Sequence, residues 1–172
     1  MENQNHAFNY AYLLKQVKAR VLLAQKKAIY TANEEMLSMY WDIGKLLSES
    51  QKQIGWGNNA LEKLANDLEN DYPEMKGFSV RNCQFMIQFY NEYNQQLTNT
   101  KRAVSYLNNN EIVLPVSKLG WSHNITLMQR TKDIKARYWY MIQCLKNGWS
   151  RDFLIEAIKQ DYYHSHGALA SN

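Results

Sequence analysis

A row of polar side chains near the middle of the chain has the types that pair with DNA bases. Arg81, Gln84, Gln88 and Asn91 are spaced by three and four residues, so they would share one face of a helix. Arginine, glutamine and asparagine form bidentate hydrogen bonds with the edges of guanine or adenine. The pattern therefore predicts a helix face that contacts DNA, and an ordinary solvent-facing row of amides is the alternative.

The basic residues are clustered, which bears on the kind of partner. The formal net charge is +4, with five basic residues and no acid between Tyr10 and Tyr30, and five against one acid between Ser117 and Arg137. Clustered positive charge is typical of proteins that bind polyanions, and a solvated helix face without a partner is the alternative. The predicted phosphate contacts are Lys76, Lys101, Arg102, Lys118, Arg130 and Lys132.

Two constellations suggest catalysis, and neither meets its geometric requirements. Ser122 and His123 are adjacent, and neighbours on a helix do not face each other, so we expect Ser122 to cap a helix and His123 to make a buried polar contact. Asp71, Glu74 and Lys76 resemble a metal-dependent nuclease motif, but all three fall within one inter-helix turn. We therefore predict a binding domain with no complete catalytic site, no metal site and no cofactor.

The elements that must position these residues are predicted to be helices. Only two prolines and seven glycines interrupt 172 residues, which favours an all-α fold. A first apolar stripe steps by three and four residues and breaks at Thr31, where a second helix restarts or the first one bends. The stripe alone is too short to predict a coiled coil. Its members are Leu14, Val17, Val21, Ala24 and Ala28.

The rest of the chain is predicted to form a compact multi-helix domain. Residues 1–30 are the basic N-terminal helix and residues 31–172 the helical body, which the polar loop 94–111 would divide into two lobes. Helices over 58–72 and 79–93, joined by a long turn, have the outline of a variant helix-turn-helix or winged-helix-like element.

Cysteine usage and hydropathy indicate the compartment. Cys83 and Cys144 fall inside apolar helical patterns, which predicts two buried thiols and no disulfide. The sequence shows neither a signal peptide nor an apolar run of transmembrane length. We therefore expect a cytoplasmic protein without a membrane partner.

Six groups of residues occur along the chain in an order shared with a known family. They are Tyr40–Gly44, Gly55–Gly57 with Leu61–Leu68, Lys76–Asn82 with Met86 and Phe89–Tyr90, Trp121–His123, Arg137–Tyr140 and Trp149–Arg151. In this order the segments resemble the N-terminal domain of the bacterial YhcG family of predicted PD-(D/E)XK nucleases. The resemblance covers nearly the whole chain from about Tyr30 onward.

The resemblance implies a helical, DNA-binding domain joined to a C-terminal nuclease domain in full-length relatives. That catalytic domain lies outside this chain, so nuclease activity does not carry over to it. The leading hypothesis is a DNA-binding or targeting domain. The alternative is a protein-interaction or dimerisation module, in which the basic N-terminal helix packs against a second copy and forms a homodimer.

Overall fold

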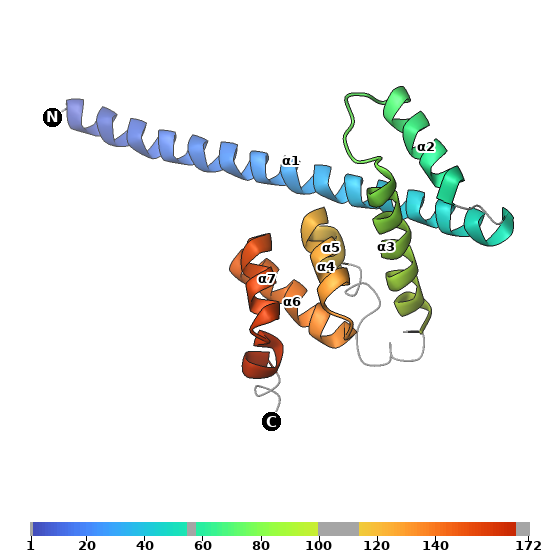
Figure 1. The fold of residues 1–172 in the computed structure, drawn as a ribbon. Helices are drawn as coiled ribbons and strands as arrows, with labels where there is room; N and C mark the ends of the chain where they lie inside the picture. Colours follow the sequence, from blue (N-terminus) through green and yellow to red (C-terminus); the bar gives the residue numbers. More distant parts are fainter. Residues whose placement is uncertain (1, 55–57, 100–113, 168–172) are drawn as a thin grey trace.

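The computed structural model describes residues 2–54, 58–99 and 114–167, and all of the regular structure in them is helical. Figure 1 shows one long helix, with the second helix of the chain on one side of it in this view and the C-terminal helices on the other. The predicted all-α fold is confirmed, whereas the helix-turn-helix or winged-helix-like element is not. The helices are α1 (Glu2–Ile54), α2 (Asn58–Asp71), α3 (Val80–Asn99), α4 (Leu114–Lys118), α5 (Trp121–Arg130), α6 (Ile134–Asn147) and α7 (Arg151–Lys159), followed by the π-helical turn η1 (Tyr163–Gly167).

Helix α1 runs through the expected break at Thr31 without interruption. Of the two alternatives, a second helix does not restart there, because a single helix extends from Glu2 to Ile54. What changes along α1 is its burial. Every side chain from Tyr10 to Ala32 is exposed, whereas Leu37, Tyr40 and Leu47 are buried. The stripe break therefore marks the point where the helix meets the body.

The body is held to the second half of α1 mainly through α3. Gly44 lies at their crossing, where an added Cβ would stand 2.1 Å from the carbonyl oxygen of Met86. Two small clusters of buried side chains fill the space around this crossing: Tyr40 with Phe78 and Met86, and Leu47 with Leu61 and Cys83. Asn33 adds the contact nearest the exposed half, since its amide donates to the carbonyls of Ser117 and Leu119, both at 3.1 Å.

The largest core cluster joins α3 to the C-terminal helices. Phe89 and Tyr93 of α3 belong to the same buried group as Leu127 of α5, Tyr140 of α6 and Leu154 of α7. Apolar side chains at helical spacing from four helices thus meet in one place, which is what amphipathic helices require to fold. Helix α3 therefore packs against α5, and α5 in turn packs against α7.

Two helix starts and both thiols depend on local chemistry. Ser79 and Ser150 accept hydrogen bonds from the backbone N–H groups of Asn82 and Phe153, as N-caps do. Both cysteines are free and buried, as predicted. Burial raises the pKa of the Cys144 thiol to about 11, so it stays protonated at neutral pH.

Two local expectations are wrong. The predicted start of the loop at residue 94 is wrong, because α3 continues to Asn99. The rest of the predicted loop, residues 100–111, lies outside the described part of the chain. Ser122 is not a cap, since Gly120 occupies the cap position of α5 and Ser122 lies inside its first turn. The first polar residues of that segment, up to Asn99, belong instead to the last turns of α3.

Candidate phosphate-binding cleft

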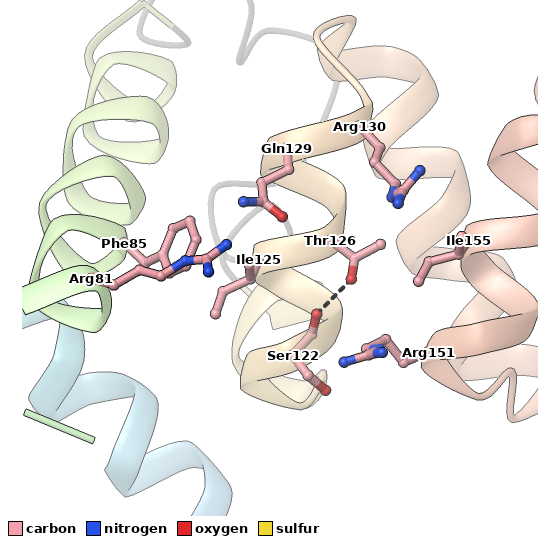
Figure 2. A pocket seen from close by; sticks show the side chains of 9 residues that line it. All are labelled: Arg81, Phe85, Ser122, Ile125, Thr126, Gln129, Arg130, Arg151 and Ile155. Atoms are coloured by element: carbon pink, nitrogen blue, oxygen red, sulfur yellow. Dashed lines mark hydrogen bonds between the residues drawn. The ribbon is translucent and has the colours of Figure 1, made fainter. Parts of the chain in front are cut away.

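A cleft of about 280 Å³ lies where α3, α5 and α7 meet. Figure 2 shows side chains from these three helices converging on it, with α5 in the middle. The lining residues are Arg81 and Phe85 from α3, Ser122, Ile125, Thr126, Gln129 and Arg130 from α5, and Arg151 and Ile155 from α7.

Three arginines and no carboxylate line this cleft, so its charge is positive. Arg81, Arg130 and Arg151 are all exposed. Arg151 lies 3.4 Å from Asp152 in an exposed ion pair, and among the described residues neither Arg81 nor Arg130 has an ion pair. Exposed pairs of that kind are weak and screened by salt. The guanidinium groups therefore keep their charge available for an anion.

The helices hold the three arginines in different ways. The guanidinium of Arg81 lies 5.6 Å from the ring centre of Phe85, a cation–π distance that directs the side chain across the cleft. Arg151 is the first residue of α7, directly after its Ser150 cap. Arg130 is the last residue of α5. Each of the three helices thus contributes one arginine to the lining of the cleft (Figure 2).

The cleft also offers neutral donors beside the arginines. Gln129 is exposed and its amide can donate to or accept from a ligand. The Thr126 hydroxyl donates to the Ser122 carbonyl at 2.8 Å, which leaves the hydroxyl oxygen able to accept (Figure 2). Guanidinium groups with amide and hydroxyl groups around them are suited to phosphate oxygens, which accept bidentate bonds from arginine.

The predicted base-reading row is only partly available. Arg81 and Gln84 are exposed on α3. Gln88 is half-buried and its amide donates to Glu92. Asn91, the last of the row, turns toward α1 and accepts a hydrogen bond of 2.7 Å from the Ser48 hydroxyl. The first two residues of the row are therefore free to contact a ligand, whereas the last two make hydrogen bonds within the protein.

The predicted phosphate contacts are spread more widely. Arg130 lines the cleft, while Lys76, Lys118 and Lys132 are exposed outside the set of lining residues. Lys101 and Arg102 lie outside the described residues. Arg137, which was counted in the second basic cluster, is buried and paired with Glu92. Spacing could not separate the exposed from the buried members of that cluster.

Arg151 is the cleft residue that the sequence reasoning missed as a site. It belongs to the segment Trp149–Arg151, which carried part of the family resemblance, and it directly follows a serine with N-cap character. A basic residue at the start of a helix is unfavourable for the helix dipole. That local conflict was the available signal for considering Arg151 as a candidate site residue.

Most other matched residues connect the helices around the cleft. Asn82 accepts a hydrogen bond of 2.7 Å from the indole N–H of Trp121 and donates to the carbonyl of Gly77. The Nε2 atom of His123 lies 2.9 Å from the carbonyl oxygen of Trp149, which agrees with the expected polar contact. Glycine is required at position 77 because its φ is 127°.

These geometric findings can be set beside comparisons with known proteins. The sequence matches the family described as the DUF1016 N-terminal domain over residues 16–165. The chain belongs to the DUF1016 N-terminal domain family. This is the N-terminal domain of the YhcG family, so the resemblance is confirmed. No curated protein and no solved structure gives a significant match.

Metal-binding clusters and membrane-spanning helices are both absent from the described residues. In residues 2–54, 58–99 and 114–167, no three His, Cys, Asp or Glu side chains come together in a way that could hold a metal ion. Across the same ranges, no helix combines the length and the apolar character needed to span a bilayer. Asp71, Glu74 and Lys76 are all exposed.

Proposed function

We propose that this DUF1016 N-terminal domain binds DNA through its phosphate backbone, with the arginine cleft at the centre of the contact. The observation that carries the proposal is the convergence of Arg81, Arg130 and Arg151 from three helices on one space without a lining carboxylate. A cleft lined by three exposed positive charges has a positive potential, which favours an anionic ligand.

A polymeric anion fits the surroundings of the cleft better than a small one. Gln84 is exposed on the same helix as Arg81, and Lys118 and Lys132 are exposed near the ends of α4 and α5. Phosphate contacts at several places along a backbone provide most of the affinity of non-specific DNA binding. Arg81 and the other basic residues would then hold phosphates, while Gln84 on the same helix faces the groove.

In full-length relatives this binding would support a nuclease domain located elsewhere in the protein. We place the activity in the cytoplasm, where two buried, protonated thiols remain reduced. A protein-interaction role is the second candidate, and the exposed apolar half of α1 is the observation that favours it. The two functions use different surfaces, so one does not exclude the other.

The test is fluorescence anisotropy of labelled duplex and branched DNA across a salt series. Replacing Arg81, Arg130 and Arg151 together with alanine should weaken binding and reduce the slope of log K against log salt by about 2–3, because each phosphate contact releases about one counterion. The wild type should lose affinity steeply as salt rises. A preference for branched DNA would indicate repair or recombination substrates.

The matched control removes the same charge elsewhere. Lys45, Lys63 and Lys146 are exposed on α1, α2 and α6 and do not line the cleft. Their triple alanine variant should bind DNA nearly as the wild type does. Equal losses in both variants would show a general effect of net charge, and no binding by folded wild type at low salt would refute the proposal.

A further inference from the structure

The N-terminal half of α1 exposes an unusual amount of apolar surface. Ten of the fifteen large hydrophobic side chains that are exposed in the described residues lie between Tyr10 and Tyr30. Figure 1 shows this part of α1 extending beyond the other helices. Soluble monomers rarely expose contiguous apolar patches, and a long helix gains most of its stability from packing. This segment therefore lacks the surface that would stabilise it.

The exposed side chains include one regular seam. The sequence alternates by four and three residues through six consecutive apolar positions, all on the exposed part of α1. In the heptad notation they occupy alternating d and a positions, which is the pattern of a two-stranded coiled coil. The spacing adds Tyr10 to the stripe, and in the described part of the chain no other helix covers these positions. The positions are Tyr10, Leu14, Val17, Val21, Ala24 and Ala28.

We infer that residues 10–30 of α1 form a parallel, two-stranded coiled coil with the same segment of a second copy of this chain. The charges beside the seam select the parallel orientation. In a parallel pair, each g position meets the e position of the next heptad on the other helix, so Arg20 meets the second copy's Gln25, and Leu13 meets its Lys18.

An antiparallel pair along the same seam is disfavoured. There, g positions face g positions and e positions face e positions, which sets Arg20 against the second copy's Arg20 and Lys18 against its Lys18. No acid between Tyr10 and Tyr30 could offset this repulsion. Like charges placed opposite each other raise the free energy of association, so the parallel pair is the arrangement that the sequence allows.

The apolar seam ends near Thr31, because the a and d positions that follow are polar or charged. Beyond Thr31 the same positions continue as Glu35, Ser38, Asp42, Lys45 and Glu49, and all of these are exposed. In a parallel pair, the three carboxylates would face copies of themselves. Pairing therefore ends near Thr31, where α1 enters its own body, and the two bodies diverge at the same end of the coiled coil.

The outer faces of the segment do not offer an equivalent seam. Tyr12, Leu22, Leu23 and Ile29 are exposed there, but basic side chains interrupt them. Among those basic residues are Lys15 and Lys26. A pair of helices thus buries the only uninterrupted stripe of residues 10–30 and leaves the interrupted faces in water.

The first experiment measures the mass of the intact chain in solution by sedimentation equilibrium. The wild type should have twice the 20.3 kDa chain mass. The double variant Val17→Glu with Val21→Glu should be monomeric and should keep the helical signal of the body, because both side chains are half-exposed and lie outside its core. Any loss of helical signal should not exceed what residues 10–30 contribute, since that segment then lacks a packing partner. Replacing Leu22 and Leu23 with glutamate adds the same charge on the outer face and should leave the dimer intact.

Three results of this experiment would contradict the proposed dimer. A monomeric wild type at tens of micromolar would overturn the proposal, as would a tetramer, which needs a second seam. Dissociation of the Leu22 and Leu23 control to the same extent would also overturn it, since the effect would then be general repulsion. None of these results depends on the arginine cleft, so they leave the DNA-binding proposal untouched.

A second experiment tests the orientation. Identical d positions face each other only in a parallel pair, so Val17→Cys should form a disulfide-linked dimer under mild oxidation. Lys15→Cys, on the outer face, is the control and should remain unlinked. The natural cysteines are buried and do not compete. A cross-link at position 15 with none at position 17 would contradict the parallel seam.

Discussion

Arginine has opposite roles in two regions of this molecule. Arg137 is buried between α3 and α6, where its guanidinium pairs with Glu92 and donates two hydrogen bonds to the carbonyl of Thr131. The three cleft arginines are exposed, and no buried acid neutralises them. A buried charge must be paired, so it stabilises structure, whereas an exposed and largely unpaired charge can attract a ligand.

Besides its ion pair with Glu92, the buried Arg137 contacts the ring of Tyr93. Its guanidinium lies 5.5 Å from the ring centre of Tyr93. Burial raises the pKa of the Tyr93 hydroxyl to about 12, so the tyrosine stays neutral beside the ion pair. Basic charge in this region therefore supports the packing of α3 on α6 and is not available to DNA.

Among the arginine substitutions that compare the two regions, Arg137→Met should have the largest effect on the free energy of unfolding. The change leaves Glu92 without its partner, and we expect it to lower the free energy of unfolding by about 3 kcal/mol, the low end of the range for broken buried pairs because Glu92 still reaches water. Urea denaturation followed by circular dichroism measures this. DNA binding by the folded fraction should be unchanged.

The companion variant Glu92→Gln keeps a hydrogen-bond acceptor for Arg137 but leaves its buried guanidinium without a counter-charge, so it should cost at least as much as Arg137→Met. A loss below about 1 kcal/mol for Arg137→Met would mean that the pair does not hold α3 on α6, since a typical single hydrogen bond contributes that much. If Arg137→Met instead lowered DNA affinity and left stability unchanged, Arg137 would belong to the DNA-binding surface and not to the packing of α3 on α6.

A smaller effect on stability is expected at Asn82, which links α3 to α5 beside the cleft. In Asn82→Ala the indole N–H of Trp121 loses its acceptor, and leaving such a half-buried donor unpaired costs about 1–3 kcal/mol. Thermal unfolding measures the change. Asn66→Ala, on the exposed side of α2, is the control. Equal melting temperatures for the two variants would show that the Asn82 link is not structural.

The sequence was sufficient for the parts of the fold that depend on local chemistry. Serine caps at positions 79 and 150, the helical class and the buried cysteines are all decided by residues close in sequence. The end of α3 was missed because its last turns are polar. Amide side chains are tolerated on the exposed face of a helix, and composition alone cannot tell such a turn from a loop.

The cleft could be predicted only in part. Arg81 and Arg130 were singled out from charge and spacing, but Arg151 is far along the chain from both. Bringing them together depends on how α3, α5 and α7 pack, which is a property of the tertiary core. Burial separates Arg137 from the others for the same reason, and no local pattern in the sequence distinguishes it.

The smallest expected effect on stability is that of the cleft arginines themselves, taken one at a time. Arg81→Ala loses one exposed ring contact and Arg130→Ala one favourable charge at a helix C-terminus, so each should cost less than about 1 kcal/mol. Arg151→Ala should be closest to zero. It loses a weak exposed pair with Asp152 but relieves a positive charge at the start of α7.

Urea denaturation of the three single variants measures these differences, with anisotropy titrations on the same samples. The distinction between the two regions predicts that DNA affinity falls while stability is nearly constant, the reverse of Arg137→Met. If any single cleft variant loses more than about 2 kcal/mol, that arginine is holding the helices together, because surface substitutions away from such contacts usually stay within about 0.5 kcal/mol. Its effect on DNA binding would then be an indirect result of unfolding.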